Sequence, residues 1–320
     1  MTQILVTGGS GFIGRNLIKA LLKDGFKVIN LSRKRSGLDV IELNVDLRDI
    51  QADHLKRFQI EAVIHTASKV GFSGRFDDFY STNVIGTKNL LDACAKIGVN
   101  KLIYTSSPIV VFDGDHIFGG DETLPYAIEP KSHYAKTKIE AEKLVLGLKN
   151  MSIAVLRPHL VFGPDDTNLI KSIVDALRTG KLFRFTEQDF LSDFTFVEDC
   201  VQAHLLALKC LLNKNLSHRI FFISSGEPVG IWKFIEEIAF SLGLSLKTRV
   251  IPEKLLKVIG FFSEIKLALG ISRLGLTRTL VEHLLRHHFF DIKRAKTVLN
   301  YDPSGEVLDK LKFSLRAWLK

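Results

Sequence analysis

A glycine-rich turn between the first expected strand and the first expected helix limits the fold more than any other feature of the chain. The run TGGSGFIG covers residues 7–14 and places Gly8, Gly11 and Gly14 three residues apart. Glycine permits the positive φ of a tight turn and lets backbone amides approach a phosphate closely. The N-terminus of the following helix then offers unpaired N–H groups to that anion. The motif predicts a dinucleotide-binding turn of the Rossmann type.

Short β-branched segments alternate with helical ones through the first half of the chain. This alternation implies crossover units and a parallel sheet covered by helices on both faces. Helices are expected at Phe12–Lys23, Asp78–Lys96, Asn168–Thr179, Glu198–Leu212 and Ile231–Leu242. Strands are expected at Gln3–Thr7, Lys27–Leu31, Val40–Val45, Ala62–His65, Leu102–Thr105 and Ser152–Leu156.

The 320 residues suffice for one such sheet and a second, smaller part. We expect an α/β fold, a Rossmann-type doubly wound parallel sheet with a smaller, mostly helical C-terminal part that binds substrate. Residues 1–165 are predicted to form the NAD(P)-binding domain, to which 190–225 return. Residues 166–189 and 226–320 are predicted to form the substrate-binding part.

Composition excludes several classes of protein. Three scattered cysteines, Cys94, Cys200 and Cys210, do not form a disulfide framework or a metal-ligand spacing and favour a reducing compartment. Charged residues interrupt every apolar stretch before 18 residues, so we expect no membrane-spanning helix. The N-terminus lacks the basic start of a signal peptide, so we expect no signal peptide. Basic residues do not interleave with aromatic ones, so we expect no nucleic-acid partner. We expect a cytoplasmic enzyme and leave association with a membrane open as an alternative.

The net charge of +9 is concentrated at the C-terminal end, because residues 246–320 hold 15 basic and 7 acidic side chains. Three interpretations stay open: an apolar substrate entrance, peripheral contact with an anionic membrane, or a core-facing stripe with a solvated basic back. A helical apolar stripe starts after Lys254, and Leu256, Phe261 and Leu267 fall off it. The stripe comprises Leu255, Val258, Ile259, Phe262, Ile265 and Leu269.

The end of the second strand indicates which dinucleotide is preferred. NAD-binding proteins place a carboxylate there for the adenosine ribose, whereas this chain has Ser32 followed by Arg33, Lys34 and Arg35. Guanidinium groups can pair with a 2′-phosphate, which a carboxylate would repel. The sequence therefore predicts NADP, with NAD possible, and a solvated basic loop is the alternative.

Tyr134 and Lys138 stand four residues apart in a helical segment, so both side chains share one helix face. A nearby ammonium group would lower the pKa of the phenol toward neutrality and let it exchange a proton with an alcohol or ketone. Ser106 and Ser107 follow the strand that ends at Thr105, at the edge where open α/β sheets bind ligands.

With these motifs in this order, the chain resembles the extended short-chain dehydrogenases/reductases over nearly its whole length. The motifs that carry the resemblance are TGGSGFIG, Asp46–Leu47, HTAS at 65–68, Asn83, YTSS at 104–107, Tyr134 with Lys138, and LRPHLVFGP at 156–164.

The resemblance implies a catalytic role for Ser107, Tyr134 and Lys138, with Ser106 the less favoured serine. Tyr134 would be the acid/base, Lys138 would support it, and Ser107 would orient the reacting oxygen; Ser107 and His159 would contact substrate. The residues expected to bind the cofactor are Gly8, Gly11, Phe12, Ile13, Gly14, Ser32, Arg33, Asp46, Leu47, Thr66, Ala67, Ser68, Asn83, Thr105, Ser106, Tyr134, Lys138, Pro158, His159 and Val161.

Two segments, at 193–208 and 276–303, look like the branch that holds 3β-hydroxysteroid and sterol-4-carboxylate dehydrogenases and bacterial reductases of long-chain β-keto acids. Residues 181–192 depart from the glycine-containing pattern usual before the first segment, which leaves the substrate class open. The resemblance implies a homodimer, paired through helices at 78–96 and 134–149.

The leading hypothesis is an NADP-dependent oxidoreductase that interconverts a secondary alcohol and a ketone on a hydrophobic substrate, such as a sterol or long-chain keto acid. A nucleotide-sugar epimerase or dehydratase, or a non-catalytic NAD(P)-binding sensor, are the alternatives. His283, His287 and His288 are expected on a surface helix, and no metal site is predicted.

Overall fold

The central element is a seven-stranded, wholly parallel sheet in the order β11-β7-β5-β4-β1-β2-β3. The computed structural model describes residues 2–71, 74–213, 216–268 and 276–318. The chain order reverses beside β1, which creates the crevice where ligands bind in such sheets. The strands are β1 (Gln3–Thr7), β2 (Lys27–Leu31), β3 (Ile41–Leu43), β4 (Ile60–His65), β5 (Lys101–Thr105), β7 (Ser152–Pro158) and β11 (Ile220–Ile223).

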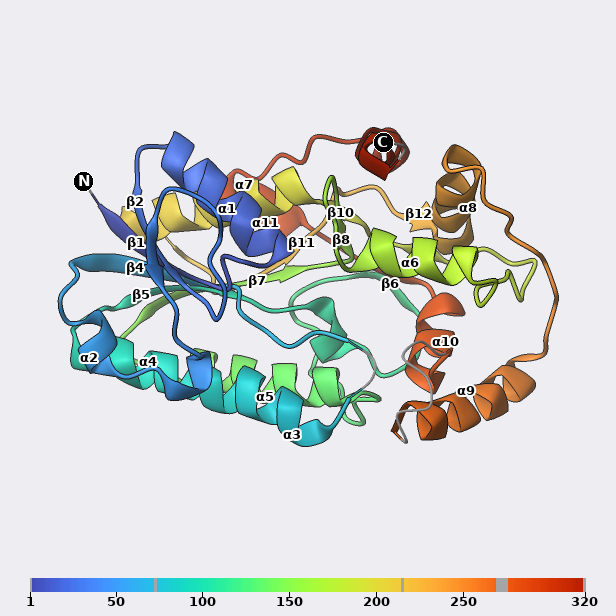
Figure 1. Cartoon of the computed structure of the whole chain (residues 1–320), viewed down its shortest axis with the longest axis horizontal. Coiled ribbons are helices and arrows are strands. Elements are labelled where there is room, and N and C mark those ends of the chain that lie inside the picture. Colours follow the sequence, from blue (N-terminus) through green and yellow to red (C-terminus); the bar gives the residue numbers. More distant parts are fainter. Residues whose placement is uncertain (1, 72–73, 214–215, 269–275, 319–320) are drawn as a thin grey trace.

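Helices cover both faces of this sheet, as the alternation of segments predicts (Figure 1). On one face lie α1 (Phe12–Lys23), α7 (Val197–Leu212) and α11 (Lys293–Leu299). On the other lie α2 (Ala52–Leu55), α3 (Phe76–Tyr80), α4 (Gly86–Lys96) and α5 (His133–Leu146). The expected α/β, doubly wound architecture is confirmed.

The single helix predicted over Asp78–Lys96 is wrong in detail. The structure has α3, a wide π-type turn at Ser81–Ile85 and then α4. The apolar periodicity of the sequence does not reveal this change, because the segment stays helical and only one turn is widened. The turn carries Asn83, whose side chain is buried beneath it. The third strand is also shorter than the predicted Val40–Val45.

The second part of the chain lies beyond the carboxyl ends of the strands (Figure 1). It contains α6 (Leu169–Arg178), α8 (Ile231–Ser241), α9 (Glu253–Ala268), α10 (Arg278–Leu284) and α12 (Val307–Leu315). Two small sheets, β12-β9-β13-β6 and β10-β8, join it to the first part. Their strands are β6 (Ile117–Gly120), β8 (Val161–Phe162), β9 (Leu191–Ser192), β10 (Thr195–Phe196), β12 (Val229–Gly230) and β13 (His288–Phe290).

This second part has an aromatic core of its own. Phe194 and Phe234 stack with ring centroids 3.9 Å apart, and Phe162 meets Phe234 edge-on at 5.4 Å. Close ring pairs of this kind stabilise a core beyond their buried area. These rings therefore form part of the core between the short strands and the helices of the second part.

The apolar stripe after Lys254 forms part of α9, but it does not face the core. Leu255, Val258, Ile259, Phe262 and Ile265 are exposed, while the off-stripe Leu256 is buried. The core-facing interpretation of this stripe is therefore wrong. The remaining stripe residue, Leu269, lies outside the described residues. Within the part of the chain that the structure describes, no helix is both long and apolar enough to span a bilayer.

Replacing a buried leucine of the helical layer should weaken folding strongly. Leu208→Ala removes a fully buried side chain between α7 and the sheet and should lower the free energy of unfolding by about 2–5 kcal/mol. Leu144→Ala, on α5 with 39% exposure, should cost less than about 1 kcal/mol. Urea unfolding of both variants measures the difference; equal losses would contradict this description of the core.

Candidate functional site

The glycine turn after β1 approaches the segment that follows β4, and its own backbone, so closely that side chains are excluded. Gly8 has φ +73°, and a Cβ there would lie 2.8 Å from the Ala67 Cα. A Cβ on Gly14 would lie 2.3 Å from the Gly8 carbonyl oxygen. Gly11 occupies the N-cap position of α1, and no side chain among the described residues caps the helix's first N–H groups. The turn and the uncapped helix end together fit a bound pyrophosphate.

A cavity of about 210 Å³ opens beside this turn at the carboxyl ends of β1, β2 and β4. Nine residues expected to bind cofactor meet in its lining. They are Gly8, Gly11, Ser32, Arg33, Asp46, Leu47, Thr66, Ala67 and Ser68.

Four further residues also line the cavity and were not predicted from the sequence: Ser10, Leu31, Val45 and Thr82. Two of them had a usable signal, because Ser10 lies within the glycine motif and Thr82 directly precedes Asn83. For Leu31 and Val45, the only signal in the sequence was their position at the ends of predicted strands.

Ser32 is held in this cavity wall by a buried polar cluster. Its hydroxyl donates to the Lys34 carbonyl at 2.5 Å and accepts from the Asn30 amide at 3.0 Å. The same Asn30 amide donates to Glu42 at 2.7 Å, and its oxygen accepts the Gly9 N–H at 3.1 Å. Asn30 thus ties the glycine turn to the end of β2, a connection that no spacing in the sequence revealed.

Arg33 is exposed and lines the cavity near Asp46. The pKa of Asp46 is lowered to about 2, chiefly by its hydrogen bonds from Arg48, with a smaller contribution from the charge of Arg33. Arg48 donates through Nε at 2.9 Å and Nη2 at 2.7 Å. Because Arg48 already occupies that carboxylate, Arg33 keeps its guanidinium group available for another anion.

Asn83 fastens the loop after β4 to α5. Its oxygen accepts from the Ser68 hydroxyl at 3.1 Å and the Lys69 N–H at 2.7 Å. Its amide donates to the Lys69 carbonyl at 3.0 Å and to Thr137 Oγ1 at 3.1 Å. All of these contacts are within the protein, so the structure gives Asn83 a positioning task.

Tyr134 lies in the first turn of α5, whose N-terminus is capped by Ser132 accepting from the Ala135 N–H at 3.1 Å. The Ser107 side chain lies beside the Tyr134 phenol, near enough to influence its pKa. Burial raises the pKa of Tyr134 to about 12, and Ser107 offsets part of this rise. The phenol therefore carries its proton at neutral pH.

Lys138, one turn further along α5, is almost completely buried. Its Nζ donates to the Tyr104 hydroxyl at 2.7 Å and to the Thr105 carbonyl at 2.8 Å. Burial lowers the pKa of Lys138 to about 7, and the charge of Glu142 opposes this shift. The expectation that this lysine brings the pKa of Tyr134 toward neutrality is not met here, because burial dominates both groups and the amine bonds to Tyr104.

The two serines after β5 point to different partners. Ser106 is buried and donates to the Glu142 carboxylate, which also pairs with Arg157 at 2.5 Å and accepts from Tyr126 at 3.0 Å. Ser107, in contrast, lies beside Tyr134 and lowers the pKa of its phenol. Ser106 thus stabilises a buried ion pair, whereas Ser107 is the serine placed next to the tyrosine.

His159 is buried just beyond β7, and its Nδ1 has no hydrogen-bond partner among the described residues. Its ring meets His288 at 5.0 Å and Phe290 at 5.5 Å. Burial, with smaller contributions from His288 and His283, holds the pKa of His159 well below its usual value. This neutral ring stands at the junction of the two parts of the chain.

The surface helix expected for His283, His287 and His288 is wrong. The helix α10 ends at Leu284, and His288 is a buried residue of β13. His283 stacks on Phe112 at 4.3 Å. The four-residue spacing of the first two histidines suggested one helix, but the chain leaves that helix before His287.

The other residues expected at the cofactor lie around the same edge. Thr105 Oγ1 bonds to His204 at 2.8 Å, and Pro158 and Val161 stand at the ends of β7 and β8. Phe12 and Ile13 begin α1 beside the glycine turn.

Comparisons with known proteins agree with this geometry. The model of the 3-beta hydroxysteroid dehydrogenase/isomerase family matches residues 5–254. The mouse protein "Sterol-4-alpha-carboxylate 3-dehydrogenase, decarboxylating" is 35% identical over 312 residues, covering 93% of this chain and 86% of its own. The "2-alkyl-3-oxoalkanoate reductase" of Stenotrophomonas maltophilia is 31% identical over 323 residues, covering 97% of both chains.

Solved structures share the fold at lower identity. MoeE5 in complex with UDP-glucose and NAD superposes with a TM-score of 0.76 at 24% identity, over 99% of this chain and 98% of that one. A UDP-glucose 4-epimerase of Thermotoga maritima gives 0.76 at 21%, over 99% of both chains. These two likenesses support the fold alone.

A buried histidine beneath the glycine turn should make stability depend on pH. His65 bonds to Thr7 at 2.6 Å and Thr87 at 2.9 Å, and burial lowers its pKa to about 3. The unfolded chain binds this proton below about pH 6.5, so the stability from the neutral ring is complete above that pH and is lost as pH falls toward 3.

When the pH falls from 7.5 to 5.5, the free energy of unfolding should decrease in both proteins. The decrease should be about 1.4 kcal/mol smaller in His65→Gln than in the unchanged protein. Urea unfolding at both values measures this. The same pH dependence in both proteins would contradict the assignment of a neutral His65.

Proposed function

The chain belongs to the 3-beta hydroxysteroid dehydrogenase/isomerase family, a branch of the extended short-chain dehydrogenases/reductases, and on that premise we propose that it is an NADPH-dependent reductase of hydrophobic 3-keto compounds. The reverse oxidation would use the same residues. Dehydrogenase or reductase chemistry on hydroxyl and keto groups is common to its named relatives.

The observation that carries the proposal is the placement of Ser107 beside the Tyr134 phenol, one helical turn from buried Lys138. Bound cofactor would supply the hydride to the carbonyl carbon. Ser107 would donate a hydrogen bond to the carbonyl oxygen, and Tyr134 would give that oxygen its proton. Because the pKa of Tyr134 is about 12, the phenol is in the acid form that reduction requires.

The glycine turn supports a bound dinucleotide. Any side chain at Gly8 or Gly14 would fill the space beside Ala67 and the turn's own backbone. Gly8, Gly11 and the start of α1 would hold the pyrophosphate, Asp46 and Leu47 the adenine, and Lys138 the nicotinamide ribose. The loop held by Asn83 would exclude water from the cleft.

Arg33 supports NADP as the dinucleotide. No carboxylate occupies the end of β2, and the nearby Glu42 carboxylate already accepts hydrogen bonds from the Asn30 amide and the Ser36 N–H. Arg33 lines the cavity and would pair with a 2′-phosphate.

The substrate proposal draws on the relatives. Their names include sterol carboxylates and 2-alkyl-3-oxoalkanoates, both with an oxidisable or reducible carbon beside an apolar skeleton. Residues 166–189 and 226–320 would enclose this skeleton, and His159, neutral and without a partner among the described residues at Nδ1, would face it. Because structural neighbours such as MoeE5 bind UDP-glucose and NAD, a nucleotide-sugar epimerase is the alternative function.

Pairing through α4 and α5 would give a homodimer. The two helices lie side by side on one face of the sheet, and Leu144 is exposed there (Figure 1). All three cysteines are unpaired, which suits the reducing cytoplasm.

A panel of long-chain 3-keto acids, 3-ketosteroids and UDP-sugars tests the proposal. Stoichiometric NADPH oxidation with a ketone would support it. Conversion of a UDP-sugar without net cofactor consumption would replace it with the epimerase.

Removing the tyrosine hydroxyl should stop turnover but not cofactor binding. Tyr134→Phe should lower kcat by about a thousandfold or more, because the carbonyl oxygen loses its proton donor. The NADPH dissociation constant, followed by fluorescence, should stay within about threefold. Tyr80→Phe, on α3 and outside the site, is the matched control; equal losses in both would contradict the role of Tyr134.

Removing the arginine in the cavity should change cofactor preference. Arg33→Ser should lower the ratio of kcat/KM for NADPH over NADH by about ten- to a hundredfold, since a charge-assisted pair is lost. Arg35→Ser removes an exposed guanidinium outside the cavity and should leave the ratio unchanged. If Arg35→Ser changed the ratio as much, preference would come from general charge and not from Arg33.

A further inference from the structure

A buried phenol on β5, which the proposed reaction does not use, lies against the amine of Lys138. Tyr104 and Lys138 are each only 2% exposed. The Lys138 Nζ donates to the Tyr104 hydroxyl at 2.7 Å and lies 4.2 Å from the centre of the same ring. The phenol therefore meets the amine both with its hydroxyl and with its aromatic face.

The amine has few hydrogen atoms to share. A charged lysine amine carries three N–H groups and has no acceptor. Two of the three are used by the Tyr104 hydroxyl and by the Thr105 carbonyl, which lies 2.8 Å from Nζ. Among the described residues, Nζ forms no further hydrogen bond. Because the four bonds of this nitrogen are tetrahedral, fixing two N–H groups also fixes the direction of the third.

The phenol belongs to the middle of the parallel sheet. In the strand register, Tyr104 pairs with His65 of β4 on one side and with Val155 of β7 on the other. The ring of His65 also lies 5.5 Å from the ring of Tyr104. Since β5 is held along both edges, Tyr104 gives the flexible side chain of Lys138 a fixed point of attachment.

Packing alone does not account for the hydroxyl of Tyr104. The ring lies in an apolar core cluster with Leu102 and Val155, where a phenylalanine ring would fill the same space. A buried hydroxyl costs free energy unless it forms a hydrogen bond. Its hydrogen-bond partner among the described residues is the Lys138 amine. The amine, and not the core, therefore explains why this residue is a tyrosine.

The phenol is a neutral partner of the amine. Burial and the charge of Glu142 hold the pKa of Tyr104 well above its usual value, so its hydroxyl keeps its proton. Glu142 is the carboxylate of this region, and it is paired with Arg157. The titratable groups around Lys138 and Glu142 come from β4, β5, β7, α5 and the loop before α5: His65, Tyr104, Arg157, Tyr134 and Tyr126.

We propose that Tyr104 is a positioning residue, whose hydroxyl fixes the Lys138 amine so that the remaining N–H points into the cofactor cleft, toward the nicotinamide ribose and the Tyr134 phenol. The inference rests on the proposed function for the groups that Lys138 would meet there. Because Tyr104 is buried behind the amine, it acts only through Lys138. Its hydroxyl accepts from the charged amine and can donate to a neutral one, so it orients both forms.

Removing this hydroxyl should shift the pH dependence of catalysis. A charged Lys138 would stabilise the phenolate that Tyr134 becomes when it gives up its proton, so activity should fall as pH rises through the pKa of Lys138, about 7. Tyr104→Phe keeps the ring but removes a hydrogen bond that favours the charged amine. The alkaline limb of kcat/KM for a ketone, at saturating NADPH, should therefore move about one pH unit lower.

Tyr301→Phe is the matched control. Tyr301 is 1% exposed and donates its hydroxyl to the Ser224 carbonyl at 2.9 Å, so this change also removes one hydrogen bond of a buried phenol. Urea unfolding should show a loss of stability in both variants, whereas the pH profile should shift in Tyr104→Phe alone. An unshifted profile in Tyr104→Phe, or an equal shift in Tyr301→Phe, would overturn the proposal.

A double-mutant cycle with Lys138→Met separates an action through Lys138 from any other role of the hydroxyl. The readout is the NADPH dissociation constant, which needs no turnover and so tests Tyr104 even if no ketone is reduced. Tyr104→Phe should weaken NADPH binding by about three- to tenfold in the unchanged background, and by less than about twofold beside Lys138→Met. Equal weakening in both backgrounds would overturn the proposal.

The cycle also covers poor folding of the single variant. Lys138→Met/Tyr104→Phe leaves neither a buried amine nor a buried hydroxyl without a partner at this place, so it should fold as well as Lys138→Met. Equal NADPH affinity in these two proteins would support an action through Lys138. A further loss of affinity in the double variant would contradict it.

Discussion

The candidate active site depends on the burial of the Lys138 amine. An unpaired buried ammonium group is costly, and here two hydrogen bonds, to the Tyr104 hydroxyl and the Thr105 carbonyl, offset that cost. Both partners belong to β5, so the bonds of Lys138 fix helix α5 against the end of that strand. The position of Tyr134 beside Ser107 follows from this attachment.

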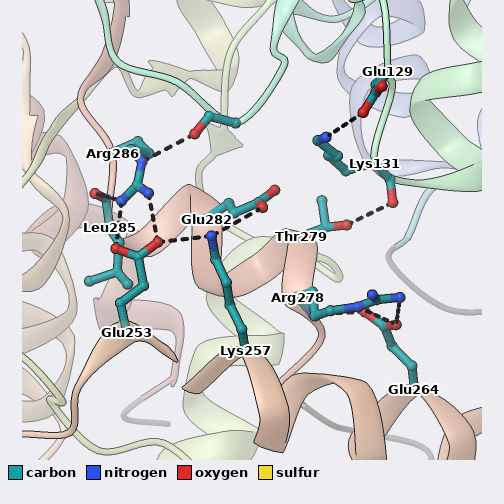
Figure 2. A network of polar contacts seen from close by, with 11 residues as sticks. Glu129, Lys131, Glu253, Lys257, Glu264, Arg278, Thr279, Glu282, Leu285 and Arg286 are labelled. Atoms are coloured by element: carbon teal, nitrogen blue, oxygen red, sulfur yellow. Dashed lines mark hydrogen bonds and ion pairs between the residues drawn. The ribbon is translucent and has the colours of Figure 1, made fainter. Parts of the chain in front are cut away.

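A second set of buried polar contacts fixes the cofactor end in the same way. Asn30 links the glycine turn to Ser32, His65 links β1 to α4 through Thr87, and Asn83 holds the loop after β4. Each group satisfies its hydrogen bonds within the protein, which makes the cleft rigid before any ligand binds. The second part of the chain meets the first through the short strands of the two small sheets and through Thr279, which donates to the Lys131 carbonyl at 3.0 Å (Figure 2).

The sequence predicted what depends on local pattern. Apolar runs and the glycine motif predicted the strands and α1, because each is a property of neighbouring residues, whereas most of the cavity lining was predicted from the family resemblance. The sequence did not predict that Lys138 bonds to Tyr104 or that His288 is buried in β13, and it left open whether the stripe after Lys254 faces the core. Those features depend on which distant segments meet, and a helical stripe indicates one face without saying what covers it.

Transfer of deuterium from NADPH that carries deuterium at both C4 positions of the nicotinamide tests the central claim most directly. The protein would be incubated with a long-chain 3-keto acid, and the alcohol product analysed by mass spectrometry. The account predicts one deuterium per product molecule at the carbinol carbon, with one NADPH consumed for each, and no transfer by Tyr134→Phe. Product without deuterium, or deuterium retained in the cofactor while a UDP-sugar is converted, would contradict it.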